Sequence, residues 1–191
     1  MTLYFITGNK NKFLEAKSIL GSVIDVEQLN IELDEIQEID ARKIIEHKLN
    51  EALKKNKELK NKELDKNKEF IIEDTSLYID CLNGLPGPLI KWFLKALGPK
   101  GVYELTKNLE NQRAVAKNLI GYSDAQGKLH FFEGEITGMI VEPRGETTFG
   151  WDPIFVPDGY DLSFAQMSKE EKNKISHRKK ALDKLVEFLN K

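Results

Sequence analysis

Residues 3–20 combine a buried-strand pattern, a tight turn and an amphipathic helix, and this combination restricts the fold more than any other segment. Leu3 to Ile6 form a short apolar run, which is typical of a buried strand. Thr7-Gly8-Asn9 breaks the run, and the apolar residues up to Leu20 recur at helical spacing before Gly21, a residue that commonly ends helices. A strand that leads through a turn into a helix is the usual start of an α/β fold.

The next segments extend this α/β pattern. Residues 23–26 are predicted to form a second strand, and a helix carrying Ile45 to Leu53 follows a candidate N-cap at Asp40. Phe70 to Ile72 are again a buried-strand run, which residues 77–79 either continue or reverse.

The second half of the chain alternates strands and helices in the same way. A rigid turn at Gly84–Pro88 precedes a helix over residues 91–94, and a second short helix is predicted over residues 102–108. The remaining expectations are two long strands around the turn Asp124–Gly127, bends or bulges at Gly134 and Gly138, a helix from the capping box at Ser168, and a last helix over residues 181–189.

Length and composition place limits on the class of protein. The 191 residues fit a single domain, which we take to span residues 1–191 as two lobes. Cys81 is the one cysteine, so an internal disulfide framework is excluded and a cytoplasmic location is expected. No apolar run is long enough for a membrane span. The formal net charge of −2 gives no overall attraction to nucleic acid or to an acidic membrane.

Residues 54–69 consist mainly of Lys, Asn and Glu, with Leu59 and Leu64 as the only large apolar side chains. A segment of this composition buries little surface, so we interpret it as a charged, exposed insertion formed by a helix extension and a loop. Contact with nucleic acid is the alternative. The segment has no interleaved aromatic residues and its acidic residues dilute the positive charge, so no nucleic-acid partner is expected.

The first turn of the chain has the composition of an anion site. Amide groups at a helix N-terminus attract anions, and a glycine allows the backbone to approach a ligand closely. The spacing is neither that of a P-loop nor that of a dinucleotide-binding turn, and an ordinary strand–helix turn with surface lysines is the alternative. The candidate phosphate-binding residues are Thr7, Gly8, Asn9, Lys10, Asn11 and Lys12.

Carboxylates lie where an α/β sheet places its ligands. Glu73 and Asp74 follow the apolar run at Phe70–Ile72, and a loop containing Glu35 supplies a second acidic group. Successive strand residues point to opposite faces, and we expect Asp74 to face the cleft. Mg²⁺ uses one or two carboxylates together with phosphates and waters. Solvated acids at strand ends are the alternative.

Residues 149–153 read Phe-Gly-Trp-Asp-Pro, and a second cluster consists of Lys172 with Ser176-His177-Arg178. Together the two clusters offer an aromatic surface, a hydrogen-bond acceptor and cationic donors, which are the groups needed to hold a purine base. A core aromatic residue and a solvated basic helix end are the alternatives.

These motifs, in this order, resemble those of the inosine/xanthosine triphosphate pyrophosphatases, in the form found in the eukaryotic and archaeal branches. The resemblance covers nearly the whole chain, although the segment 54–69 is longer than the family usually has. The matching segments are Thr7-Gly8-Asn9 with Lys12, Glu73-Asp74-Thr75, residues 84–88 with Ile90-Lys91-Trp92-Phe93, Pro143-Arg144-Gly145, residues 149–153, and Glu171-Lys172-Asn173 with Ser176-His177-Arg178.

The resemblance implies an elongated, two-lobed α/β fold with a long central mixed sheet flanked by helices and a nucleotide cleft between the lobes. It also implies a homodimer and a Mg²⁺ requirement. Residues 7–12 would hold the triphosphate, Glu35 and Asp74 would bind the metal, and Asp74 would accept a proton from the attacking water. The remaining nucleotide contacts implied by the resemblance are Lys48, Thr75, Lys91, Phe149, Gly150, Trp151, Asp152, Lys172, His177 and Arg178.

The expected reaction is hydrolysis of a deaminated purine nucleoside triphosphate, such as ITP, dITP or XTP, to the monophosphate and pyrophosphate. Two alternatives remain open from the sequence. One is a nucleotide-binding sensor without turnover, which would need no acidic metal site. The other is a pyrophosphatase that acts on a modified pyrimidine nucleotide.

Overall fold

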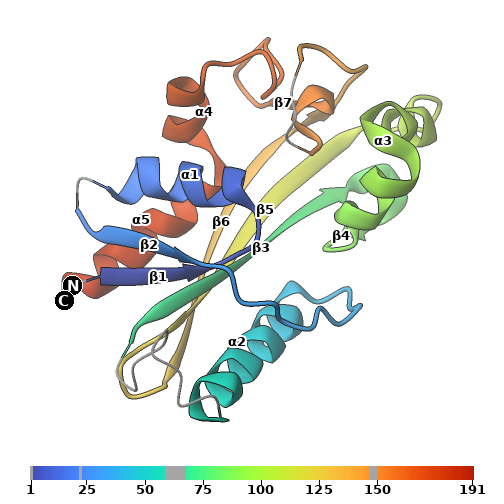
Figure 1. Ribbon diagram of the computed structural model, residues 1–191. Coiled ribbons are helices and arrows are strands. Elements are labelled where there is room, and N and C mark those ends of the chain that lie inside the picture. The colour runs from blue at the N-terminus through green and yellow to red at the C-terminus, as the bar shows by residue number, and fades with distance from the viewer. Residues whose placement is uncertain (1, 22, 59–67, 147–149) are drawn as a thin grey trace.

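The structure is a computed structural model that describes residues 2–21, 23–58, 68–146 and 150–191. Within these ranges, seven strands form one mixed sheet in the order β2-β1-β3-β5-β6-β7, with β4 paired to the edge of β3 (Figure 1). The strands are β1 (Thr2–Ile6), β2 (Asp25–Leu29), β3 (Phe70–Ile79), β4 (Pro86–Gly87), β5 (Arg113–Ser123), β6 (Leu129–Ile140) and β7 (Phe155–Pro157). The helices are α1 (Lys10–Leu20), α2 (Ala41–Glu58), α3 (Ile90–Thr106), α4 (Lys169–Ile175) and α5 (His177–Leu189), with the short 3-10 helices η1 (Asp80–Leu82) and η2 (Asp152–Ile154).

Helix starts agree with the capping signals in the sequence. The side chain of Asn9 accepts hydrogen bonds from two backbone amides of the first turn of α1. Asp40 accepts one from the amide of Arg42 at the start of α2 (2.9 Å). Ser168 and Glu171 form the expected capping box of α4. Local sequence therefore determines where these helices begin.

Several expected elements differ in detail. β2 begins at Asp25, two residues later than predicted. β3 is one strand of 10 residues, so residues 77–79 continue it. The two helices predicted after the turn at Gly84–Pro88 are two parts of α3, which is kinked at Gly98, where φ is 67°. Proline at position 99 cannot donate its backbone nitrogen to a continuous helix, so the kink falls there.

The expectation of bulges in β6 was wrong. β5 and β6 pair without interruption from Arg113–Met139 to Ser123–Leu129. The two glycines of β6 instead allow close packing by neighbouring backbone. A Cβ atom at Gly134 would lie 2.2 Å from the carbonyl oxygen of His177 in α5, and one at Gly138 would lie 2.3 Å from the carbonyl oxygen of Val156.

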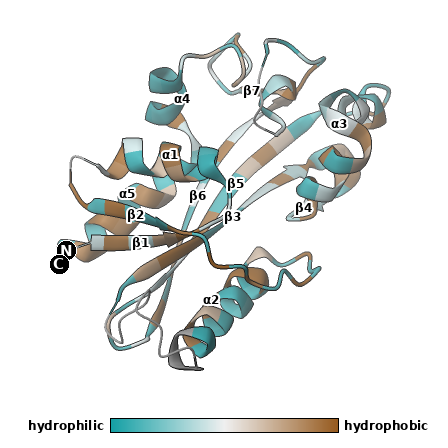
Figure 2. Ribbon diagram, in the orientation of Figure 1, coloured by the Kyte–Doolittle hydropathy of each residue, from teal (hydrophilic) through white to brown (hydrophobic). Residues whose placement is uncertain are grey.

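Helices cover both faces of the end of the sheet that contains β1 and β2. One face packs against α1 and α5 around residues such as Phe5 and Leu182, and the other packs against α2 around Ile45 and Leu49. Figure 2 shows hydrophobic stretches along the central strands, whereas α2 alternates between hydrophobic and hydrophilic residues. This is the pattern of a sheet buried between amphipathic helices.

A separate hydrophobic cluster forms the second lobe at the other end of the long strands. It joins Leu77 and Ala116 of the sheet to Val102 of α3 and to Trp151 and Phe155. β3, β5 and β6 run through both lobes (Figure 1). The mixed sheet and its two lobes confirm the expected fold class. None of the helices in the described ranges has the length and apolar character needed to cross a membrane.

The edge of β3 changes neighbours between the two lobes. β1 pairs with β3 at Phe70 and Ile71, and β4 pairs with it at Leu77 and Tyr78. Within the described part of the chain, no strand pairs with residues 72–76 on this side. The backbone edge of this central stretch therefore faces an opening between the lobes.

Candidate active site

A cavity of about 1060 Å³ occupies this opening and draws its lining from both lobes. One side consists of the turn after β1, the loop before α2 and α2 itself. The other consists of the first turns of α3 and the Gly150-Trp151 pair, and β3 forms the floor. The volume lies at the upper end of the range typical of small-molecule sites. The position agrees with the expected cleft between lobes.

Most of the predicted site residues line this one cavity. Those that do are Thr7, Gly8, Asn9, Asn11, Lys12, Glu35, Lys48, Asp74, Thr75, Lys91, Gly150 and Trp151. Lys10 is exposed on the first turn of α1 and lies outside the lining. Asp152, Lys172, His177 and Arg178 are buried behind the lining rather than part of it. Phe149 lies outside the described residues.

The turn after β1 is organised by the side chain of Asn9. Its Oδ1 accepts from the backbone amides of Asn11 (3.0 Å) and Lys12 (3.1 Å), and the backbone amide of Asn9 donates to Thr7 Oγ1 (3.1 Å). Two of the amides that the sequence assigned to an anion are thus occupied by the helix cap. Attraction for a phosphate at this turn then comes from the N-terminal end of α1 and from the Lys12 ammonium.

The acidic residues of β3 lie on opposite faces, as predicted. Asp74 lies on the face of β3 that packs against α2, and it accepts from Ser76 Oγ (3.3 Å). Burial raises the pKa of Asp74, the neighbouring Glu35 and Glu73 raise it further, and Lys12 and Lys48 oppose the shift. A carboxylate whose pKa is raised toward neutrality is suited to accept a proton from water.

Glu35 joins the two lobes through two lysines. Its carboxylate lies 2.5 Å from Nζ of Lys48 on α2 and 2.5 Å from Nζ of Lys91 on α3. Burial raises the pKa of Glu35, but the two lysines outweigh this effect and hold that pKa at about 2. Glu35 is therefore ionised at any pH near neutrality and can hold a cation.

The lining contains four lysines, at positions 12, 48, 91 and 95, and four carboxylates, at positions 32, 35, 73 and 74. The positive and negative charges of the lining are therefore equal in number. The carboxylates would repel the phosphates of a bound polyphosphate, and a divalent cation between the carboxylates and the phosphates would reduce this repulsion. The described residues contain no group of three or more His, Cys, Asp or Glu side chains in metal-binding geometry. Glu35 and Asp74 offer the carboxylate oxygens that Mg²⁺ prefers, and Mg²⁺ takes one or two carboxylates and completes its shell with phosphates and waters. Glu35 and Asp74 are the residues that would hold it.

A buried ion network lies on the other face of β3. Arg178 binds Glu73 through two hydrogen bonds, from Nε (2.9 Å) and Nη2 (2.7 Å), a geometry that is among the strongest of side-chain contacts. Lys12 Nζ lies 3.4 Å from the same carboxylate. Burial would raise the pKa of Glu73, but the charges of Arg178 and Lys12 hold it at about 2.

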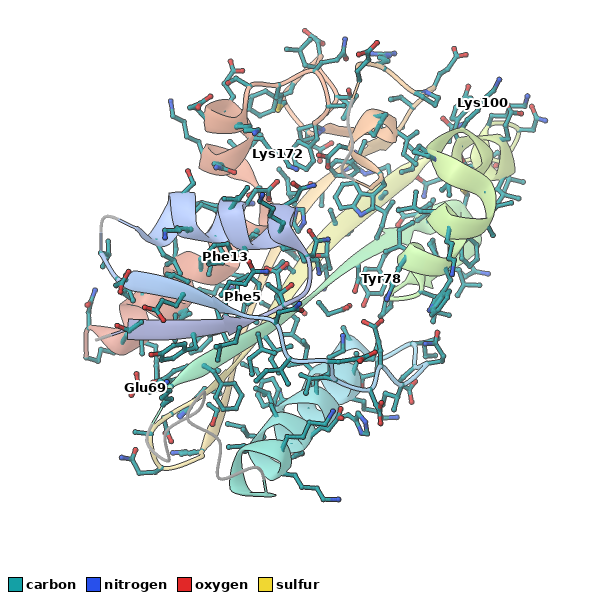
Figure 3. The ribbon with its side chains drawn as sticks, viewed as in Figure 1. Phe5, Phe13, Glu69, Tyr78, Lys100 and Lys172 are labelled. Atoms are coloured by element: carbon teal, nitrogen blue, oxygen red, sulfur yellow. The ribbon has the colours of Figure 1, made fainter. Side chains whose placement is uncertain are left out.

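Sequence reasoning missed Glu15, which connects this network to the base-binding candidates. Its carboxylate pairs with Arg178 Nη1 and with Lys172 Nζ, the latter at 3.2 Å. Lys172 also binds Asp152 at 2.6 Å, and Figure 3 labels Lys172 on α4 above α1. The available signal was the spacing: Glu15 follows Lys12 by three residues, which places the two on neighbouring turns of one helix face.

Aromatic rings surround the imidazole of His177. The ring centroids of Trp151 and His177 are 5.4 Å apart, and the ring of Phe164 lies 6.2 Å from that of His177 and 6.1 Å from that of Trp151. Burial, together with the charges of Arg178 and Lys172, lowers the pKa of His177, so the imidazole is neutral. Neither of its ring nitrogens has a hydrogen-bond partner among the described residues.

Comparison with known sequences places this geometry in context. The profile described as the Ham1 family matches residues 3–188. The inosine triphosphate pyrophosphatase of Saccharomyces cerevisiae is 42% identical over 195 residues, which cover 98% of this chain and 95% of that protein. The protein of the same name from Schizosaccharomyces pombe is 38% identical, with 98% and 95% covered.

Solved structures show the same architecture. The Ham1 protein of Staphylococcus aureus superposes with a TM-score of 0.74 at 26% identity, covering 100% of this chain and 98% of that one. A HAM1 protein from Coxiella burnetii gives a TM-score of 0.77 at 23% identity, with 100% and 98% covered, and supports the fold alone.

Proposed function

The chain belongs to the Ham1 family, and from this premise we propose that it is a nucleoside triphosphate pyrophosphatase. It hydrolyses deaminated purine nucleotides, such as ITP, dITP and XTP, to the monophosphate and pyrophosphate. The observation that supports this function is that one cavity is lined by the turn after β1, by the acidic residues Glu35 and Asp74, and by Trp151. This cavity offers surroundings for a polyphosphate, a divalent ion and a flat base.

Asp74 is assigned the role of proton acceptor for the attacking water. Its carboxylate faces the cavity, its pKa is raised, and Ser76 Oγ orients one of its oxygens. Lys12, Lys48 and Lys91 place positive charge around the triphosphate, so the charge that develops on the departing pyrophosphate is stabilised. Mg²⁺, when bound by Glu35 and Asp74, supplies further neutralisation of that charge.

Base selectivity follows from donors that only an oxo-purine satisfies. Hypoxanthine and xanthine carry an acceptor at the position where adenine carries an amino donor. Lys172 and Arg178 are already engaged by buried carboxylates. The neutral His177 lies outside the cavity lining, but it retains hydrogen-bonding capacity next to Trp151, which lines the cavity. A buried donor left unpaired by adenine costs about 1–3 kcal/mol, and several such bonds allow discrimination on the order of 10⁴.

The test is release of pyrophosphate from ITP, measured with Mg²⁺ and with a chelator in its place. Activity with Mg²⁺ that the chelator removes supports the proposal. Binding of ITP without turnover under both conditions would favour the sensor instead. A panel of ITP, XTP, dITP, GTP, ATP and pyrimidine triphosphates decides the base, and faster turnover of a pyrimidine nucleotide would overturn the purine assignment.

A homodimer and a cytoplasmic location remain predictions. The family resemblance supports the first, and the single cysteine, a free thiol at position 81, supports the second. Light scattering on the purified protein tests the dimer, for which we expect twice the 21.9 kDa mass of the chain. A mass of one chain at micromolar concentration would contradict it.

A further inference from the structure

Asn118 is a fully buried polar residue in the middle of β5. It stands opposite Thr75 of β3 on one side and opposite Gly134 of β6 on the other. Its Oδ1 has no hydrogen-bond partner among the described residues. A buried acceptor without a partner costs free energy that an apolar side chain in the same place would avoid. The gain from an asparagine here must therefore come from its amide nitrogen.

That nitrogen is surrounded by acceptors. Nδ2 lies 3.2 Å from Thr75 Oγ1 and 3.4 Å from the carbonyl oxygen of Asp74. Burial raises the pKa of Glu73, and the charges of Arg178 and Lys12 lower it. A hydrogen bond from the Asn118 amide also lowers this pKa, by less than those charges do. The opposite amide orientation would turn Oδ1 toward these acceptors, so the surroundings fix Nδ2 as the donor.

Thr75 Oγ1 also accepts from a second donor. Nη2 of Arg178 lies 3.4 Å from Thr75 Oγ1. A hydroxyl oxygen has two acceptor positions and one proton. With Asn118 and Arg178 in the acceptor positions, the hydroxyl proton is the remaining hydrogen-bonding function of Thr75, and this half-buried residue lines the cavity.

We propose that Asn118 is a positioning residue that, with Arg178, holds the Thr75 hydroxyl as a hydrogen-bond donor toward a phosphate oxygen of the bound nucleotide. This inference rests on the proposed function, since it assigns a partner to a hydroxyl of the same cavity. Asn118 itself does not line the cavity and acts through Thr75. Without the Asn118 amide, the Thr75 hydroxyl can rotate and its proton can turn away from the cavity.

The experiment is a double-mutant cycle on kcat/KM for ITP. Thr75→Val removes the donor, and we expect a fall of about tenfold to a hundredfold, as for a lost hydrogen bond to a charged oxygen. Asn118→Leu, of similar volume but without a donor, should lower kcat/KM about threefold to tenfold in the wild-type chain. In the Thr75→Val background the same change should have almost no effect on kcat/KM, because no hydroxyl remains to be oriented.

Thermal unfolding of the wild-type chain, the two single variants and the double variant separates an effect on stability from an effect on kcat/KM. Any cost in stability from Asn118→Leu should persist in the Thr75→Val background, whereas its cost in kcat/KM should vanish there. Asn118→Ala is a second variant without the donor, and it replaces Asn118→Leu if that variant does not fold. It lacks the donor but leaves a space, so a similar loss of kcat/KM supports a hydrogen bond. Losses that instead follow side-chain volume would overturn the proposal.

The outcomes also separate this inference from the proposed function. If the wild-type chain releases no pyrophosphate from any nucleotide in the panel, the proposed function fails and the inference fails with it. If the wild-type chain is active and the Asn118 variants keep its kcat/KM, or lose it equally in the Thr75→Val background, the positioning role alone is refuted.

Discussion

Replacement of Glu73 by glutamine tests the buried network under the candidate site. The substitution keeps the shape of the side chain and removes its charge. Glu73 is paired with Arg178 at 2.7 Å and Lys12 at 3.4 Å, and its side chain is 2% exposed. In the variant, the guanidinium keeps Glu15 as a partner but loses the two-pronged contact with Glu73.

The expected magnitude follows from the pKa. The pKa of Glu73 falls from its ordinary 4.5 to about 2 on folding. At about 1.4 kcal/mol for each pH unit, ionised Glu73 contributes roughly 3 kcal/mol to the free energy of unfolding at pH 7. Removal of one partner from a buried ion pair costs about 3–5 kcal/mol in other proteins. The two estimates agree, and the loss is a large share of the stability of a typical domain.

The pH dependence has a definite sign. Because the folded pKa is lower than the unfolded pKa, the contribution is complete above about pH 4.5 and is lost as the pH falls toward 2. The difference in the free energy of unfolding between the wild-type chain and Glu73→Gln should therefore shrink from about 3 kcal/mol at pH 7 to about 2 kcal/mol at pH 3.5.

Urea unfolding followed by circular dichroism at both pH values measures these differences. Glu187→Gln is the matched control, since Glu187 pairs with Lys191 at 3.0 Å but its side chain is 71% exposed. An exposed pair of this kind should change stability by less than about 0.5 kcal/mol. A cost below about 1 kcal/mol for Glu73→Gln at pH 7, or a cost that grows as the pH falls, would refute the reasoning.

Three further predictions concern the catalytic carboxylate, the buried Asp152 and the charged insertion. Asp74→Asn should reduce pyrophosphate release at least a thousandfold with an unchanged circular dichroism spectrum, and near-normal turnover would remove Asp74 from the mechanism. Burial raises the pKa of Asp152 to about 6 against the opposing charge of Lys172, so its ionisation destabilises the folded chain as the pH rises from about 4 to 6. Relative to the wild-type chain, Asp152→Asn should therefore gain about 3 kcal/mol in unfolding free energy between pH 3.5 and pH 7, and a constant difference would contradict this shift. Replacement of residues 59–67 by a Gly-Ser linker of equal length should leave kcat/KM for ITP within about twofold, and a folded but inactive variant would assign the insertion a function.

Local patterns predicted the elements of this fold well because capping and burial act over a few residues. Asp40 and Ser168 cap helices where the sequence indicated. The glycines of β6 were misinterpreted as bulges, since the sequence does not show which backbone packs against them. Gly134 faces α5, a helix that begins more than 40 residues later.

The residues of the candidate site likewise fall into a group that the sequence predicted and a group that it did not. Twelve of the residues that line the cavity were predicted, from short motifs or from the family resemblance. The supporting residues were missed. Glu15 reads as an ordinary helix-surface acid and Asn118 as an ordinary strand residue, yet they contact residues 163 and 43 positions away. Contacts of such separation leave no local periodicity.

By itself, the sequence determined the α/β class, the starts of α2 and α4 and the chemical types of many residues that line the cavity, because each depends on neighbours along the chain. The tertiary structure alone decided that β1 stops pairing with β3 after Ile71 and so opens the cavity above Asp74. It also decided which charges are buried together. Both depend on how distant strands and helices pack, and the free energy of a buried charge is set by the groups that the fold brings around it.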